Sequence, residues 1–155
     1  MELNEKEKFI YTDAINFFKT LKGDEHPAWG LMNAQQMIEH LCDSVAIANG
    51  NAPLPMHTAE DQVAKWKAFA MSDKDFKPNT PNALMGENPP AVQHISITVA
   101  IKQLQNELAS LHEFYKTNPE RTEMNPFFGP LNYAEWVHLF HKHFRHHLRQ
   151  FGLID

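Results

Sequence analysis

The sequence predicts an all-α protein, a four-helix bundle with an additional short helix and a long crossover loop. Apolar residues recur at intervals of three and four over four long segments, the pattern of amphipathic helices. No segment alternates apolar and polar residues as a half-buried strand does. The 155 residues, 43% of them hydrophobic with eleven Phe and three Trp, fit a single globular domain spanning 1–155.

The first two long helices are indicated by their periodicity and by their end signals. One is expected over residues 4–21. The next is expected to follow Asn33, a residue suited to cap a helix N-terminus, and to reach Asn49 before Gly50 ends it.

A short helix and an irregular crossover are expected in the middle of the chain. The short helix should open with Thr58 as its N-cap and run to about Phe69. Residues 72–93 predict a long irregular connection, so the order of the helices around the bundle stays open. The prolines of this segment are Pro78, Pro81, Pro89 and Pro90.

The last two long helices carry the clearest stripes and caps. One is expected to start at His94 or Ser96 and to continue to about residue 117, with a near-heptad apolar stripe. The other is expected to be capped by Asn132, with Glu135 three residues later in a variant of the capping box.

Two histidines of the last helix are candidate metal ligands. At about 100° per residue, His143 and His147 lie about 40° apart, on the same face as Trp136 and Phe140. That face is expected to be buried, and the i, i+4 spacing lets both rings reach one point, as in helical zinc motifs. The alternatives are exposed polar residues or core histidines held by hydrogen bonds.

His40 is the candidate third ligand. It lies in the middle of the second helix, on the same face as Met37 and Leu41. A lone histidine on an apolar face is more often a structural core residue, and that alternative stays open. Three imidazoles from two facing helices would leave open coordination positions on a metal. Binding needs neutral rings and is therefore expected to weaken below about pH 6.

Four further residues are candidates to line the site or to orient its ligands: Gln36, Asp43, Ser44 and Gln150. Gln150 could orient His147 or hydrogen-bond a bound water. Glu39 and Asp43 flank His40 in sequence but point off its face, and Asp43 is the nearer to the buried seam. Both are expected on the solvated helix surface or as partners of the ligands.

The other histidines of the last helix are expected away from the seam. His138 and His141 share an outward face, which should be solvated or should contact a second subunit, and His146 lies on the fringe. The neighbouring basic residues are expected to lie on a solvated face: Lys142, Arg145 and Arg149.

These motifs together resemble the DinB/YfiT-like superfamily of metal-dependent enzymes, over essentially the whole chain. The residues that carry the resemblance are His40, the aromatic lead into it from Trp29, and the final motif 143–150, which reads His-Phe-Arg-His-His-Leu-Arg-Gln. The loop 126–130 and the segment 133–136 further resemble an uncharacterised branch of that superfamily. The usual family motif has Arg-Gly where this chain has Leu-Arg before the final glutamine.

The resemblance implies a four-helix bundle, often a homodimer, with a divalent metal, typically zinc or nickel, on His40, His143 and His147. Such a metal can activate water for hydrolysis or a low-molecular-weight thiol for transfer to a small-molecule substrate. Two alternatives stay open. One is a non-catalytic module that binds a metal or small ligand, for example a stress-linked sensor. The other is a structural bundle whose histidines are satisfied by hydrogen bonds.

Composition narrows the class of partner. The net charge is −5 with no block of like charge, which argues against nucleic-acid binding. No run approaches the eighteen or so apolar residues of a membrane span, and the charged N-terminus lacks the apolar core of a signal peptide. Cys42 is the single cysteine, so an internal disulfide is excluded. These features favour a cytoplasmic protein.

Overall fold

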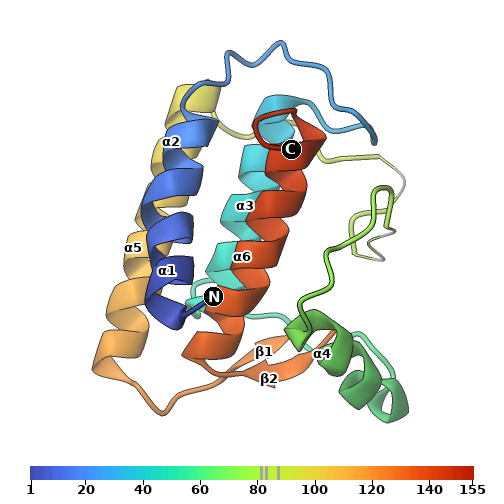
Figure 1. The fold of residues 1–155 in the computed structure, drawn as a ribbon, viewed down its shortest axis with the longest axis vertical. Coiled ribbons are helices and arrows are strands. Elements are labelled where there is room, and N and C mark those ends of the chain that lie inside the picture. Colours follow the sequence, from blue (N-terminus) through green and yellow to red (C-terminus); the bar gives the residue numbers. More distant parts are fainter. Residues whose placement is uncertain (81, 83, 87) are drawn as a thin grey trace.

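The computed structural model describes residues 1–80, 82, 84–86 and 88–155, and it is mostly helical with one small sheet. Pro81, one of the prolines of the expected crossover, lies outside the described residues. Four helical segments lie side by side along the long axis, and α4 and the sheet lie at one end of them (Figure 1). The elements at that end are α4 (Val63–Met71), β1 (Glu123–Asn125) and β2 (Gly129–Leu131).

The N-terminal helical segment contains a π-helical turn. It consists of α1 (Leu3–Lys8), the π-helical turn η1 (Phe9–Asp13) and α2 (Ala14–Phe18). The segment therefore ends three residues before the predicted boundary at residue 21. Such single π-helical turns insert one extra residue into a helix, which amphipathic periodicity alone does not reveal.

The other long helices begin at side-chain caps. They are α3 (Ala34–Ala48), α5 (Ile97–Thr117) and α6 (Tyr133–Gln150). The predicted caps Asn33 and Asn132 are confirmed, since each side chain accepts a hydrogen bond from the backbone N–H three residues later, at 2.8 and 2.9 Å. Of the two candidates for the start of α5, Ser96 is the cap, with Oγ 3.2 Å from the N–H of Val99.

The predicted start of the short helix at Thr58 is wrong. α4 begins at Val63, after a 3-10 turn over Glu60–Gln62, and it continues to Met71. The reason lies in a backbone contact, because the carbonyl of Pro126 accepts hydrogen bonds from the N–H groups of His57 and Thr58. These bonds hold the chain against the hairpin where the helix was expected to begin.

The structure also contains a small antiparallel sheet, which the sequence pattern did not predict. Its strands β1 and β2 pair with Met124 opposite Pro130. Each strand has three residues, which is too short for an alternating pattern to show. The turn is closed by Asn125, whose Oδ1 accepts from the N–H groups of Phe127 and Phe128 at 2.9 and 3.1 Å.

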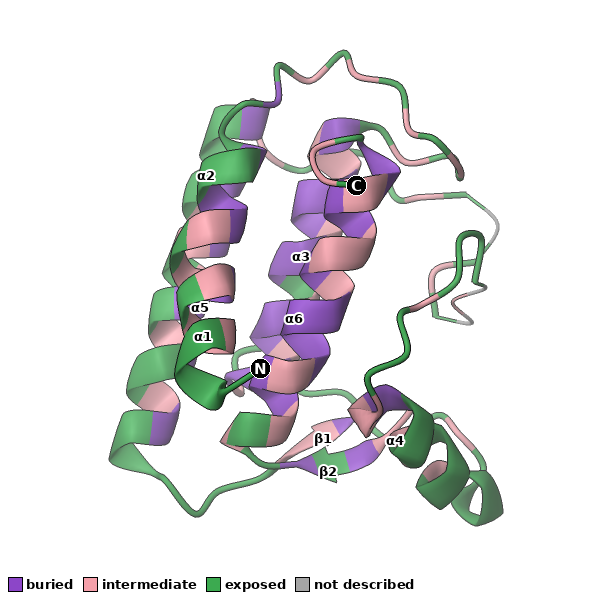
Figure 2. Ribbon diagram, viewed as in Figure 1, coloured by how far each residue is buried: buried purple, intermediate pink, exposed green. Residues whose placement is uncertain are grey.

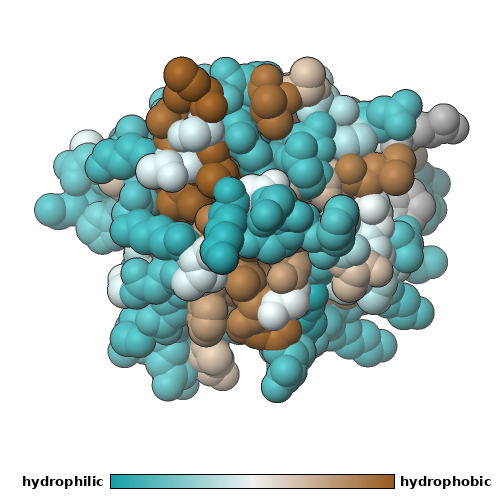
Figure 3. Space-filling model, turned by 90° about the horizontal axis from the view of Figure 1, so that it is seen from above, coloured by the Kyte–Doolittle hydropathy of each residue, from teal (hydrophilic) through white to brown (hydrophobic). Residues whose placement is uncertain are grey.

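The core lies between the four long helical segments. Buried residues face one another across these helices, while α4 is mostly exposed (Figure 2). Trp136 and Phe140 of α6 stack with ring centroids 5.5 Å apart, and Phe144 packs edge-on against Phe18 of α2. Seen from above, the apolar groups at the surface form separate patches between polar side chains (Figure 3).

None of the helices in the described part of the chain combines the length and the apolar character that crossing a bilayer requires.

Candidate metal centre

Three histidines from two helices converge inside the bundle. α3 contributes His40, and α6 contributes His143 and His147. Nε2 of His143 lies 3.1 Å from Nε2 of His40 and 3.0 Å from Nε2 of His147. One nitrogen from each ring lies within 4.8 Å of the other two. The three candidate ligands of the sequence analysis are therefore brought to one point.

Gln150 fixes the orientation and the tautomer of His147. Its Nε2 donates to the backbone carbonyl of Trp29 at 3.0 Å, which turns Oε1 towards His147. Because an amide oxygen can only accept, Nδ1 of His147 must be the protonated nitrogen of the 2.7 Å bond between them. The Nε2 lone pair of the neutral ring then points at the cluster.

A glycine at residue 30 lets the loop before α3 approach the Gln150 side chain closely. A Cβ on Gly30 would lie 3.1 Å from Nε2 of Gln150, and its φ of +79° is a conformation that favours glycine. The N–H of Ala28 also donates to the carbonyl of Gln150, at 2.7 Å. The loop therefore binds both the backbone carbonyl and the side-chain amide of Gln150.

The ring nitrogens of the three histidines are better suited to binding a divalent cation than to hydrogen-bonding with one another. With its Nδ1 protonated, His147 offers only a lone pair at Nε2. Nε2 of a neutral His143 carries either one proton or one lone pair, so it cannot make full hydrogen bonds to both His40 and His147. A divalent cation accepts one lone pair from each ring and removes this conflict.

Burial keeps the rings neutral. It lowers the pKa of His40 to about 4, with repulsion from His146 as a second cause. It also lowers the pKa of His143 and His147 well below the usual value, and the neighbouring histidines lower both further. The lone pairs are therefore free at neutral pH, and proton competition should begin well below the pH of about 6 expected from an unperturbed histidine.

The other site candidates on α3 have their polar groups engaged elsewhere. The side chain of Gln36 accepts from the N–H of Asn33 at 2.9 Å and donates to the carbonyl of Pro90 at 2.9 Å. Ser44 Oγ donates to the carbonyl of His40 at 3.0 Å, within the same helix. Asp43 is exposed. None of these contacts joins a side chain to the imidazole cluster.

Glu39 is buried and structural, although its sequence pattern suggested the helix surface as one role. Its carboxylate accepts from the N–H groups of Gln93 and His94 and from the side chain of Gln35, at 2.7, 3.2 and 3.0 Å. Burial alone would raise the pKa of Glu39, but these hydrogen bonds outweigh it and lower the pKa. Glu39 therefore anchors the end of the crossover to α3 beside the centre.

The predicted outward face of α6 is covered, which corrects the expectation for three of its residues. His141 and Lys142 are buried, and His138 is half-buried. The reason is that the N-terminal segment and the chain after α4 pack over this face: the ring of Phe9 lies edge-on to His141, and Nε2 of His138 donates to the carbonyl of Ser72 at 3.0 Å.

Aromatic rings border the centre beside His146. The ring centroids of Trp29 and Phe76 lie 5.2 and 6.2 Å from that of His146, which itself lies 5.0 Å from His147. Phe76 also lies edge-on to His143 at 6.4 Å. His146, which helix geometry placed at the edge of the buried face, therefore packs between aromatic rings next to the candidate ligands.

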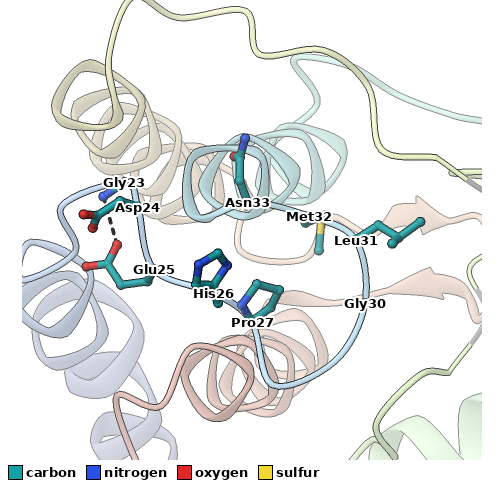
Figure 4. A pocket seen from close by; sticks show the side chains of 9 residues that line it. All are labelled: Gly23, Asp24, Glu25, His26, Pro27, Gly30, Leu31, Met32 and Asn33. Carbon is teal, nitrogen blue, oxygen red and sulfur yellow. Dashed lines mark hydrogen bonds between the residues drawn. The ribbon is translucent and has the colours of Figure 1, made fainter.

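A surface cavity lies in the loop over residues 23–33, next to the start of α3 (Figure 4). Its lining includes His26, Pro27, Met32 and the cap residue Asn33, and it includes none of the three converging histidines. The cavity and the candidate metal centre are therefore separate features of the same end of the molecule.

Comparisons of this chain with protein-family models, with curated proteins and with solved structures find no match. The case for a function therefore rests on the residues of this chain.

Proposed function

We propose that this protein is a metal-dependent enzyme of the DinB/YfiT-like type, a four-helix bundle with a divalent cation, zinc or nickel, on His40, His143 and His147. The observation that carries the proposal is the convergence of three Nε2 atoms from two helices. A divalent cation there supplies Lewis acidity, which lowers the pKa of a water or thiol ligand. The proposed substrate is a small electrophile, and the proposed assembly is a homodimer.

The surroundings favour a thiol over water as the activated nucleophile. Hydrolysis generally uses a carboxylate as general base. Among the described residues, the cluster that could hold a metal contains only imidazoles. The nearby carboxylate of Glu39 is engaged by backbone N–H groups, and Asp43 is exposed. Cys42 is buried and donates to the carbonyl of Ala100, so the thiol would come from a cosubstrate.

The residues around the three histidines would set the tautomer and the charge state of these ligands, and none of them is proposed to transfer a proton in the reaction. Gln150 holds Nδ1 of His147 protonated and so directs the Nε2 lone pair to the metal. Burial keeps His40 and His143 neutral and able to donate their lone pairs. The same features serve the second candidate function, a non-catalytic module that binds a metal, which is favoured by the absence of a carboxylate from the described cluster.

The test is the metal content of protein purified without a tag. We expect about one equivalent of zinc or nickel in the wild type and its loss in His143→Ala. The matched control is His57→Ala, because His57 is exposed and lies beside Phe127, away from the cluster. No metal in the wild type, or equal metal in wild type and His143→Ala, would contradict the proposal.

Activity then separates the two candidates. The metal-loaded protein is assayed with low-molecular-weight thiols and small electrophiles, and with hydrolysable esters. Turnover that is present in wild type and His57→Ala but absent in His143→Ala supports the enzyme. Metal binding without turnover of any of these substrates supports the binding module.

A further inference from the structure

The segment Ser72–Phe76, here called the strap, connects the end of α4 to the metal centre. The chain leaves α4 and rises along the side of the molecule on which α6 lies (Figure 1). At the first strap residue, the carbonyl of Ser72 accepts from Nζ of Lys142 at 3.1 Å and from Nε2 of His138 at 3.0 Å. His138 in turn accepts at Nδ1 from the ammonium of Lys6, 2.9 Å away.

A second attachment fastens the far part of the strap to the same helix. Asp75 pairs with the guanidinium of Arg145 and lies 3.4 Å from that of Arg149. The attachment points His138, Lys142, Arg145 and Arg149 recur at intervals of three and four, so they form one stripe along α6. The strap is therefore fastened along one side of the helix that also carries His143 and His147.

Lys142 is the central attachment. Its Nζ donates to the carbonyls of Phe69, Ala70 and Ser72, each at 3.1 Å, and the side chain is 2% exposed. Three acceptors match the three N–H groups of an ammonium, and they lie at the C-terminal end of α4, where helix carbonyls lack partners. The ammonium also lies 4.9 and 5.1 Å from the rings of Phe69 and Phe76.

The strap places one aromatic ring on the metal centre. Phe76 is half-buried and lies edge-on to His143 and His146, at 6.4 and 6.2 Å between ring centroids. Phe69, which shares the Lys142 ammonium with Phe76, is 41% exposed and belongs to α4. Of the two rings on Lys142, Phe76 is thus the one packed against a candidate ligand.

We propose that the strap is the gate of the metal centre, in which Phe76 covers one side of the histidine cluster and Lys142 latches the strap to α6. Metal and exogenous ligands then exchange when the strap is released. This inference rests on the proposed metal-dependent function. Such gating by a short segment needs only local opening, which costs less than global unfolding.

The test is the rate at which excess chelator removes zinc from the loaded protein in a stopped-flow experiment. We expect Phe76→Ala to raise this rate at least about tenfold, the change produced by about 1.4 kcal/mol of lost contact. Lys142→Met should raise it similarly. Phe69 is unsuitable as a control because its ring lies 6.0 Å from that of Phe76. The control is Trp66→Ala, which removes an exposed ring of α4 that stacks on Phe127, and its rate should stay within about twofold of wild type on the same scale.

The possible outcomes separate failure of the proposed gate from failure of the proposed metal binding. A Phe76→Ala rate equal to that of wild type or Trp66→Ala, with one equivalent of zinc bound, would overturn the gate but not the metal centre. A wild type that binds no zinc would overturn both. If Lys142→Met does not fold, the comparison of Phe76→Ala with Trp66→Ala still tests the gate.

Discussion

Gln150 offers a sharp test of how the protein prepares its candidate ligands. Gln150→Leu keeps the volume of the side chain but removes two hydrogen bonds, a buried one to His147 at 2.7 Å and a part-buried one to the carbonyl of Trp29 at 3.0 Å. The variant leaves His147 free to rotate and to protonate either nitrogen. We expect metal affinity to fall about 10- to 100-fold, the usual effect of losing the partner that orients a ligand histidine.

The same substitution should also destabilise the metal-free protein. It leaves the buried N–H of His147 and the part-buried carbonyl of Trp29 without their partners, which is expected to lower the free energy of unfolding by about 1–3 kcal/mol. Urea unfolding of the metal-free protein measures this change. Competition for zinc against a chromophoric chelator measures the change in affinity.

Gln150→Glu separates the two effects. A carboxylate still accepts from Nδ1 of His147 but cannot donate to the carbonyl of Trp29. We expect this variant to be destabilised less than Gln150→Leu, because only the carbonyl of Trp29 loses its partner, and to bind zinc at least as tightly as the wild type. Equal zinc affinity in wild type and Gln150→Leu would refute the reasoning that this hydrogen bond sets the ligand tautomer.

Three further predictions concern stability. The pKa of His40 is about 4 in the folded chain and 6.5 as a reference, so between these pH values the unfolded state binds more protons than the folded state. The unfolding free energy of the metal-free protein should therefore fall by about 2–3 kcal/mol through His40 as the pH drops from about 7 to 4. His40→Gln should remove this contribution to the pH dependence of the unfolding free energy measured in urea titrations. Gly129→Ala should cost about 1–3 kcal/mol, since φ is +82° and the new Cβ would meet Val63 at 3.0 Å, whereas Gly152→Ala has open space and should cost less in the same thermal melts. Asn132→Ala should cost about 1 kcal/mol by removing the α6 cap; unchanged unfolding would contradict that role.

Local signals in the sequence located the long helices well. Asn33 and Asn132 are caps because their short side chains reach the N–H three residues on, a contact that depends on a few neighbouring residues only. The angular spacing of His143 and His147 on α6 likewise follows from helix geometry. The convergence of His40 on the same point required the packing of α3 against α6, which the shared apolar faces of the two helices indicated.

Features that depend on distant segments could not be read from the sequence. Lys142 and His138 have the composition of a solvated face, and they are covered because the N-terminal segment and the strap after α4 pack onto α6. The π-helical turn Phe9–Asp13 changes the register within one helix without a distinct composition. Thr58 has the residue type of a cap, but backbone bonds to Pro126 hold the chain there in another conformation.

The central claim is that three imidazoles hold one divalent cation, and X-ray absorption of the zinc-loaded protein tests it most directly. We expect three imidazole nitrogens at about 2.0–2.1 Å from zinc, with the signal of outer imidazole atoms reduced in His40→Ala. A spectrum with sulfur in the coordination sphere, with fewer than three imidazoles, or unchanged in His40→Ala would contradict it.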